Sequence, residues 1–559
     1  MSRPISVAAR SVFRDTFSNS SSRSISRAHT PLPDGEENGS LDVNFLSLEE
    51  LLLKKLESLQ ALLLQSELED TENRDSMVAN SQDYRQSHAV AMNKNRIQSD
   101  HTTIVDIINS LQHPRSEVSS LSREMLLAQL YKLIVTKPVY VSNSESTGVV
   151  TEEDVLDLVK ILSASDYRSS TEFILLYRSC ISLLVSDLDD FGEIVSTDFL
   201  ASIETLFTDS HNSYITNENK ANVITGYCGL LLALYGDTSA FGIDDKVKWM
   251  MEYASGFVQS AVTLKTQLKT GDREYSTLMH ESDDKLLVSE QEASAQAEAA
   301  IAVASLHGVA VLITLLQKGD YLNDLLTHIA TEVIEIIDND MIPELSKAAA
   351  KVLALCYELY TYEENSEDDE DDEEFNYNAP VYEQESILNI LNRLANVSSK
   401  KIGKKEKNKS STFKEVANTI QNYTDAEKRT EIYKRTQTGI ELLAGSVSST
   451  QIKLSRSKFL PINSWFLYFR LLHMKWLFGF GLHDQLVGNP NVKSLLREPS
   501  TEYQLKYSRS DASEYDGTSY GNNARKDTDR FVDPEKKRAT EKKKAIENKI
   551  SEKFDQLEL

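Results

Sequence analysis

A lysine-rich run that begins at Lys400 is the pattern in this sequence that most directly indicates chemistry. Its basic side chains are Lys400, Lys401, Lys404, Lys405, Lys407, Lys409 and Lys414. Glu406 and Glu415 are the acids within the run. Lysine ammonium groups bind phosphates as point charges, and each contact with a nucleic-acid phosphate releases a counterion. The run therefore predicts binding to a polyanion such as RNA, although a solvated surface or a nuclear-localisation signal has the same composition.

A second basic cluster lies near the end of the chain and predicts a basic helix, since helix-forming residues follow Pro534. Its members are Arg525, Lys526, Arg530, Lys536, Lys537, Arg538, Lys542, Lys543, Lys544 and Lys549. Residues 400–559 carry 31 basic and 21 acidic side chains, whereas residues 1–399 carry 29 and 65. This asymmetry indicates an acidic body joined to a basic C-terminal module, which suits nucleic acid better than a membrane surface as its partner.

The segment between the two basic clusters is rich in aromatic residues at helical spacing. Trp465, Phe469 and Trp476 are four and seven residues apart, which places them on one face of a helix, and leucines occupy another face. A helix that is apolar all round is usually buried, so we expect these rings to pack in a core. The alternative is a base-stacking platform, because aromatic rings also stack on the bases of RNA.

Two basic residues interrupt this apolar helix, and two glycines follow it. We expect Arg470 and Lys475 to face outward, where they would contact phosphate. We expect Gly479 and Gly481 to end the helix, since glycine readily adopts the backbone conformation that stops helices. If Trp465 is a core residue, its replacement by alanine should lower stability by roughly 3–5 kcal/mol.

The sequence carries no local signature of an enzyme. It lacks GxxxxGK[ST], HExxH and GxSxG, and it lacks a GxGxxG that follows a strand. His280 and Glu281 have no second histidine at helical spacing, so they do not predict a metal site. We therefore expect a protein that is not an enzyme and that uses no metal, no cofactor and no small-molecule substrate.

The elements that must position these residues are helices. Glycine (20 residues) and proline (11 residues) are scarce for a chain of 559 residues, which disfavours folds with frequent turns. Helical periodicity predicts helices over 103–112, 121–136, 151–163, 171–187, 197–207, 220–235, 243–269, 289–317, 321–338, 343–361 and 385–394. Helix pairs recur at roughly 40 residues, as in armadillo and HEAT repeats. We predict an all-α fold: an armadillo/HEAT-like α-solenoid with a C-terminal helical basic module and disordered termini.

Composition also predicts where the parts of the chain begin and end. The expected parts are a disordered Ser/Arg-rich tail (1–40), a helix with a polar linker (41–99), the solenoid (100–362), an acidic disordered loop (363–384), the end of the solenoid with a C-terminal block (385–499) and a basic, partly helical tail (500–559). Ten carboxylates lie within residues 363–374. They suit a solvated insertion or an intramolecular mask of the lysine-rich run, and the sequence does not decide between these.

The cellular location is predicted from four features. Residues 1–29 hold five arginines, many serines and one acid, a composition shared by mitochondrial presequences and disordered tails, and the early Pro4 favours a tail. No apolar secretory signal follows the N-terminus. The apolar stretch 299–317 contains Ser305 and His307, so we expect a buried helix and no membrane span. Three widely spaced cysteines fit a reducing compartment. We expect a cytoplasmic protein, with nuclear and mitochondrial locations as alternatives.

Two ordered blocks in the C-terminal third resemble the interferon-related developmental regulator family. The first is 404–416 (KKEKNKSSTFKEV), in which Phe413 follows the lysines and Val416 ends the motif. The second begins at Trp465 and continues through the turn 477–481 (LFGFG) to Asn489 and Lys493. The resemblance makes Phe413 and Asn489 structural residues and adds Lys493 to the basic residues that could contact RNA.

A weaker third block, 346–360 (SKAAAKVLALCYELY), is similar to the Ala-rich family helix that closes an armadillo-like body. This sequence departs from the family pattern at three places. Ala350-Lys351 stands where the family has Gly-Glu, Gln485 replaces a histidine and Lys493 replaces an arginine. These departures leave the packing argument intact and put any role specific to those side chains in doubt.

The resemblance implies a non-enzymatic adaptor with an armadillo-type solenoid. Proteins of this family are associated with ribosomes held out of translation and with transcriptional co-regulation. We therefore expect a factor that binds rRNA through its basic C-terminal module and represses or shelters inactive ribosomes. The alternatives are a nuclear co-regulator scaffold that binds peptides in the solenoid groove and a mitochondrially targeted helical protein. The sequence leaves open the ribosomal site, the trigger for binding and the oligomeric state.

Overall fold

The computed structural model divides the chain into two compact units, Met1–Glu498 and Pro499–Leu559. All residues that the structure describes lie in the first unit. They are residues 48–61, 103–115, 118–139, 150–164, 166–209, 215–236, 240, 242–274, 283–339, 341–362, 379–381, 383–400, 409–438, 450–454 and 459–497. The acidic loop at 363–374 and the basic cluster at 525–549 lie outside them.

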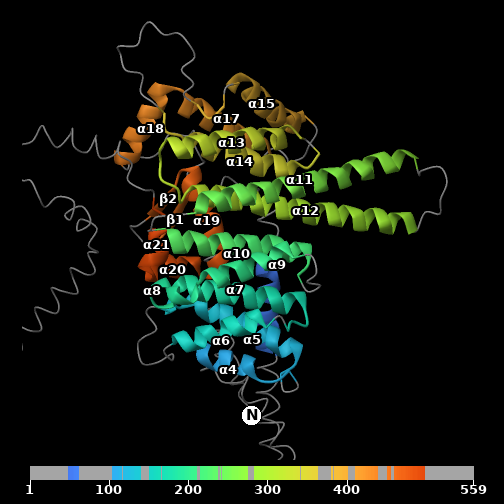
Figure 1. Cartoon of the computed structure of the whole chain (residues 1–559), viewed down its shortest axis with the longest axis vertical. Helices are drawn as coiled ribbons and strands as arrows, with labels where there is room; N and C mark the ends of the chain where they lie inside the picture. The colour runs from blue at the N-terminus through green and yellow to red at the C-terminus, as the bar shows by residue number, and fades with distance from the viewer. Residues whose placement is uncertain are drawn as a thin grey trace, which may run out of the picture. The chain divides into compact units, whose positions relative to one another are not determined.

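The described residues confirm the predicted all-α solenoid, which is built from two rows of helices (Figure 1). In the inner row, each helix packs on the next. The inner row is α5 (Ser120–Thr136), α7 (Ser170–Ser186), α10 (Asn217–Tyr235), α12 (Asp283–Ile313), α14 (Pro343–Leu359) and α17 (Lys409–Thr424). The outer row packs on the inner one. The outer row is α4 (Ile104–Gln112), α6 (Glu152–Ser163), α9 (Thr197–Thr208), α11 (Ile243–Glu274), α13 (Asp320–Asp338) and α15 (Gln384–Lys400).

Helix boundaries follow local sequence signals. Thr103 and Thr151 each form a capping box, in which the threonine side chain accepts from the N3 backbone and the N3 aspartate accepts from the threonine backbone. Ser119, Ser169 and Thr216 cap α5, α7 and α10 through their hydroxyl groups. These caps explain why the helices predicted from periodicity begin within three residues of the observed starts of α4, α5, α6, α7 and α10. The starts of α9, α11, α13 and α14 were predicted equally closely from periodicity.

The remaining elements are short, and most were not predicted. They are α8 (Leu188–Phe191), η2 (Gly192–Ile194), α18 (Ala426–Thr438), β1 (Thr450–Lys453), β2 (Phe459–Ile462), α19 (Trp465–Phe478), η3 (Gly479–Gly481), α20 (Leu482–Gly488) and α21 (Pro490–Ser494). β1 and β2 pair antiparallel, with Thr450 opposite Ile462. Residues 48–61 form a further helix, which we call the N-terminal helix and which lies within the part 41–99 that was predicted to hold a helix and a polar linker.

Burial separates the two rows. Inner helices such as α7 and α14 bury side chains on every face, whereas the outer helix α13 buries one leucine- and isoleucine-rich face. A helix is buried all round only when neighbours cover both of its sides. The outer row covers one side, and α19 covers the other along α7, α10, α12 and α14. The described apolar residues therefore form one continuous core.

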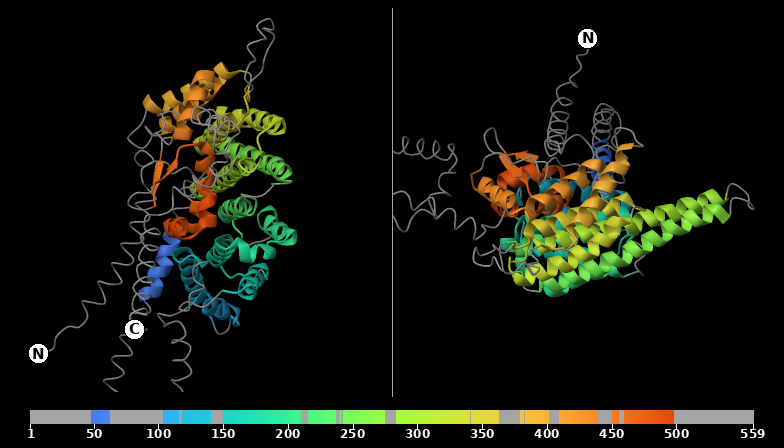
Figure 2. Two further views of the ribbon diagram at one scale, coloured as in Figure 1. Left: turned by 90° about the vertical axis from the view of Figure 1, so that its left-hand side faces the viewer. Right: turned by 90° about the horizontal axis from the view of Figure 1, so that it is seen from above.

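The apolar stretch in α12 belongs to this core. Ser289–Ile313 is the one stretch among the described residues that is long and apolar enough to span a membrane. However, 83% of its most apolar window is buried by the rest of the protein. The predicted buried helix is therefore confirmed. Its first half pairs with α11 in a helical hairpin that extends beyond the neighbouring helices of the solenoid (Figure 2).

The crossing of α19 over α10 is a test of how closely the core is packed. A methyl group added to Gly226 of α10 would lie 2.6 Å from Cη2 of Trp476 and 2.7 Å from Cε1 of Tyr177. No atom lies within 4 Å of the equivalent position on Gly256, which is exposed on α11. The two glycines therefore differ in packing although both lie within helices.

We expect Gly226→Ala to lower the free energy of unfolding by about 1–3 kcal/mol, because overpacking forces Trp476 or Tyr177 out of place. The matched control Gly256→Ala should raise it by about 0.5–1 kcal/mol, because alanine is a better helix former. Urea unfolding followed by circular dichroism measures both. Equal destabilisation by the two variants would contradict the close crossing of α10 and α19.

Candidate functional site

The C-terminal family block forms a segment that returns along the inner row of the solenoid. We call residues 465–497 the return segment. Its helix α19 contacts α14, α12, α10 and α7, and η3 and α20 then contact α5. The segment therefore runs from the C-terminal end of the solenoid back toward its beginning (Figure 2). Sequence analysis predicted the burial of its aromatic residues, and Trp465, Phe469 and Trp476 are buried.

The first turn of α19 is held by an acidic side chain from the solenoid. The Glu358 carboxylate of α14 accepts from the backbone N–H of Trp465 at 2.8 Å and of Phe466 at 2.9 Å. Ser464 caps the same turn through the N–H of Leu467. The indole Nε1 of Trp465 donates to Oγ1 of Thr419 on α17 at 3.0 Å. A carboxylate at a helix N-terminus is stabilised by the helix dipole, so this end of α19 is fixed in place.

The last turn of α19 is held by a basic side chain from the solenoid. Arg178 of α7 is fully buried and donates through Nε to the carbonyl of Trp476 at 2.8 Å. Tyr131 and Ser182 donate their hydroxyl hydrogens to the carbonyl of Leu477, at 3.0 and 2.6 Å. The guanidinium carbon of Arg178 lies 4.3 Å from the ring centroid of Tyr131. The C-terminal carbonyls of α19 thus find buried donors, as the helix dipole requires.

Gly479 ends α19, as the sequence predicted. Its φ of +44° lies in the region that favours glycine. A side chain there would also overlap the Glu49 carboxylate and lie 2.9 Å from both Nη2 of Arg178 and the Tyr131 hydroxyl. Glycine at this position therefore serves both the turn and the close approach of three solenoid side chains.

The prediction that Arg470 faces outward is wrong. Arg470 is only 5% exposed, because its guanidinium lies between α12 and the end of the return segment. It donates through Nε and Nη2 to the hydroxyl and carbonyl of Thr314, and through Nη1 to the carbonyl of Leu495. Its charge is used to join two segments of backbone, so it is not placed to contact phosphate.

The other predicted basic residues fall into two groups. Lys414 is exposed on α17, and Lys475 and Lys493 are half-buried on the return segment. Lys400 ends α15 and Lys409 begins α17, and these two helices pack on each other. The lysine-rich run therefore spans the connection between two packed helices. The remaining members, together with the side chains of Lys400 and Lys409, lie outside the described residues: Lys401, Lys404, Lys405, Lys407, Arg525, Lys526, Arg530, Lys536, Lys537, Arg538, Lys542, Lys543, Lys544 and Lys549.

The predicted structural residues of the family blocks lie in the core. Phe413 is buried on α17, and Asn489 is buried between α20 and α21. Asn489 donates to the carbonyl of Ser186 at 2.6 Å and accepts from the first turn of α21. Gln485, which stands where the family has a histidine, donates to the carbonyls of Ile134 and Val135. Gln485 therefore joins α20 to the end of α5.

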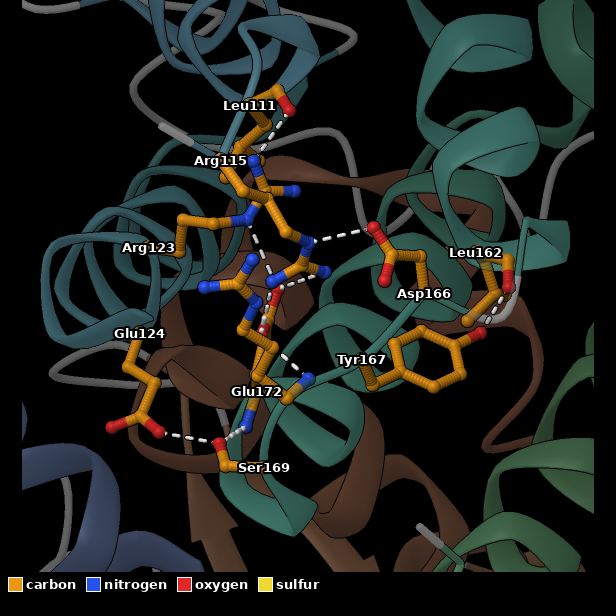
Figure 3. A network of polar contacts seen from close by, with 10 residues as sticks. Leu111, Arg115, Arg123, Glu124, Leu162, Asp166, Tyr167, Ser169 and Glu172 are labelled. Carbon is orange, nitrogen blue, oxygen red and sulfur yellow. Dashed lines mark hydrogen bonds and ion pairs between the residues drawn. The ribbon is translucent and has the colours of Figure 1, made fainter. Parts of the chain in front are cut away.

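A buried ion-pair network joins the first helices of the solenoid (Figure 3). Glu172, in the first turn of α7, pairs with Arg123 of α5 and with Arg115 of the α4–α5 connection, each at 3.0 Å. Arg115 also pairs with the exposed Asp166 at 2.8 Å, and Arg123 donates to the carbonyl of Leu111 at 2.7 Å. The network therefore joins α5, α7 and the α4–α5 connection.

The described residues also offer no reactive cysteine. Burial raises the pKa of Cys180 to about 12, and it raises the pKa values of Cys228 and Cys356 further above their ordinary value. Among the described residues, no three His, Cys, Asp or Glu side chains lie together in a way that could hold a metal ion.

Two buried histidines lie where α19 crosses α12. His307 of α12 packs on the ring of Phe469 at 5.5 Å, and neither of its ring nitrogens has a partner among the described residues. His473 of α19 donates through Nδ1 to the carbonyl of Phe469 at 2.8 Å, if this nitrogen carries the hydrogen. Burial lowers the pKa of His473 to about 4, and burial with the nearby Lys351 ammonium lowers that of His307 well below its ordinary value.

These pKa shifts predict that acid weakens the packing of α19 on α12 and lowers the stability of the protein. Both histidines take up a proton near pH 6.5 in the unfolded chain but not in the folded one, so stability falls as the pH drops from 6.5 toward 4. His473 alone should account for a loss of about 2 kcal/mol between pH 7.5 and pH 5. Urea unfolding at the two pH values measures this. His473→Leu should remove that part of the pH dependence, whereas His328→Gln, at an exposed position on α13, should leave it unchanged.

The core position of Trp465 generates a second prediction. Trp465→Ala should lower the free energy of unfolding by about 3–5 kcal/mol, because it removes a buried indole and its bond to Thr419. Trp465→Phe keeps most of the packing and should cost less. Chemical unfolding measures both variants. A fully stable Trp465→Ala protein that merely loses affinity for RNA would instead support a base-stacking role.

The sequence analysis missed the solenoid residues that hold the return segment. Arg178, Lys351 and Glu358 are charged residues inside otherwise apolar helices, and Lys351 donates to the Tyr468 hydroxyl of α19 at 2.6 Å. A charged side chain at the centre of an apolar helix indicates a buried polar partner. That signal is present in the sequence, but it does not identify the partner.

Comparison with known proteins was made for the whole chain. Residues 274–421 match the family model described as Interferon-related developmental regulator (IFRD). The match includes the Ala-rich helix α14 and the lysine-rich run, and it ends before the return segment. No curated protein and no solved structure matches the chain. The family is not known as an enzyme family. The match confirms the resemblance predicted from the sequence: residues 274–421 are identified as an interferon-related developmental regulator region.

Proposed function

We propose that this chain is a non-enzymatic, cytoplasmic factor that binds rRNA through basic C-terminal residues and represses or shelters inactive ribosomes. The observation that carries the proposal is the family match across the lysine-rich run. The family resemblance indicates the ribosome as the partner. The lysines of the run are the side chains that would contact its phosphates. The run connects α15 and α17, so a packed helix pair presents it at the end of the solenoid.

The distribution of charge supports RNA contacts through the C-terminal basic residues and not through the solenoid. Residues 1–399 carry 65 acidic and 29 basic side chains, so the solenoid is repelled by RNA as a whole. Several basic residues of the described core are also occupied: Arg178 and Arg470 hold backbone carbonyls. RNA contacts are therefore assigned to the lysine-rich run, to Lys414, Lys475 and Lys493, and to the C-terminal cluster.

The occupied inner row weighs against the alternative of a peptide-binding co-regulator scaffold. In that alternative, a partner peptide would lie along the inner helices. In the structure, α19 already covers α7, α10, α12 and α14. A peptide would therefore have to displace a buried segment of the same chain, which the ribosome-binding proposal does not require.

Deletion of residues 525–559 should weaken association with ribosomes more than deletion of residues 1–40, because the first removes eleven basic residues and the second removes five. Sedimentation through sucrose gradients at 50 and 200 mM salt measures association. If about six phosphate contacts are made, affinity should fall roughly a thousandfold between these salt concentrations.

A matched variant separates the two basic regions. Replacing Lys401, Lys404, Lys405 and Lys407 by glutamine should reduce the slope of affinity against salt, because each lysine that contacts a phosphate releases a counterion. Equal sedimentation of both deletions and of this variant with the full chain, at both salt concentrations, would contradict rRNA binding through the basic residues.

A further inference from the structure

The N-terminal helix is held on the solenoid by side-chain contacts. Forty-one residues, 62–102, separate it from the N-cap of α4. The helix is therefore not continuous with α4, and its own contacts set its position on the solenoid. A helix of this length is also only marginally stable by itself in water. Its order therefore depends on the surface that it contacts.

One face of the N-terminal helix enters the core. Its buried leucines are Leu48, Leu52, Leu56 and Leu59. They recur every three to four residues, so they form a single stripe. The opposite face bears exposed polar residues, among them Lys54, Glu57 and Ser58. The helix is thus an amphipathic ligand seated against the helices of the solenoid (Figure 2).

The polar anchor of this helix lies at its first turn. Glu49 is buried, and its Oε1 accepts from Nη2 of Arg178 at 2.5 Å. The same guanidinium donates to the carbonyl of Trp476, and the absence of a side chain at Gly479 leaves space for the carboxylate. The receptor for Glu49 is therefore composite: it consists of α7 and the end of the return segment, which are about 300 residues apart in sequence.

A second ion pair anchors the middle of the helix. Lys55 pairs with Glu124 of α5, which also accepts from the Ser169 hydroxyl at the start of α7. The helix therefore has one contact that depends on the return segment and one that depends on the solenoid alone. Binding of the N-terminal helix therefore depends in part on whether the return segment is packed on the solenoid.

We propose that α5, α7 and the α19–η3 turn form a receptor groove for an amphipathic helix, and that residues 48–61 occupy the groove as a tethered, displaceable ligand. The groove selects a helix with a carboxylate in its first turn and leucines three, seven and ten positions later, as Glu49, Leu52, Leu56 and Leu59 are spaced. Partner helices of this pattern compete with the N-terminal helix. The inference is independent of ribosome binding.

The test uses the full chain with a protease site inserted between residues 80 and 81. The protein folds intact and is then cut, which removes the tether. The probe is a fluorescent synthetic peptide of residues 44–65, and its anisotropy measures binding. A tether raises the local concentration of its helix to about the millimolar range, so the peptide should bind the cut chain at least tenfold more tightly than the uncut chain.

Two variant peptides test the pattern. Glu49→Gln should weaken binding to the cut chain by about tenfold or more, because the peptide leaves the buried Arg178 without its anion. Lys54→Gln alters an exposed position and should bind like the original peptide. Equal binding of the Glu49→Gln peptide overturns the proposed receptor.

Three further outcomes also overturn the proposal. A cut chain that keeps its own helix and excludes a large excess of peptide shows a permanent element of the core. A cut chain that loses helical circular dichroism beyond the released segment shows that the helix is required for folding. Dimers of the uncut chain in sedimentation velocity assign the groove to a second copy instead of the chain's own helix.

Discussion

The structure depends on the seating of one apolar helix between two charges of opposite sign. Glu358 holds the N-terminus of α19, and Arg178 holds its C-terminus. Each charge matches the end of the helix dipole that it faces, so the pair fixes the direction as well as the position of α19. Reversing the helix would place a carboxylate against carbonyls and a guanidinium against N–H groups. The inner row of the solenoid can be apolar on all sides because α19 covers the side that the outer row leaves open.

This constraint links segments that are distant in the sequence. Arg178 contacts Glu49 on one side and the carbonyl of Trp476 on the other, so the beginning, the middle and the end of the described chain meet at one guanidinium. A buried charge whose partner is removed is strongly destabilising, so the three segments stabilise each other. The family match ends within the inner helix α17, and Trp465 of the return segment donates to Thr419 of that helix.

Periodicity predicted most of the solenoid because helix formation is decided largely by local patterns and caps. The same local patterns could not predict the path of the return segment, whose contacts with α7 span nearly 300 residues. They also failed at Arg470. An arginine in an apolar helix fits an outward phosphate contact and a buried bond to carbonyls equally well, and only the position of Thr314 decides between them. The hairpin of β1 and β2 was missed because four-residue strands are too short for alternation to be distinguished from loop sequence.

The basic residues also divide into those that are buried and those that are exposed. Basic residues that lie within apolar helices are drawn into the core, where backbone carbonyls compensate their charge, as Arg178 and Arg470 show. Basic residues whose side chains face away from the core keep their charge available to solvent and to phosphate, as at Lys414, which is exposed on α17 although Phe413 beside it is buried. An acidic solenoid lowers the affinity of RNA for most of the surface and so restricts binding to the few positions where lysines cluster. Under the proposed function, folding and RNA binding therefore use different basic residues, divided by whether each side chain is buried against backbone carbonyls or faces solvent.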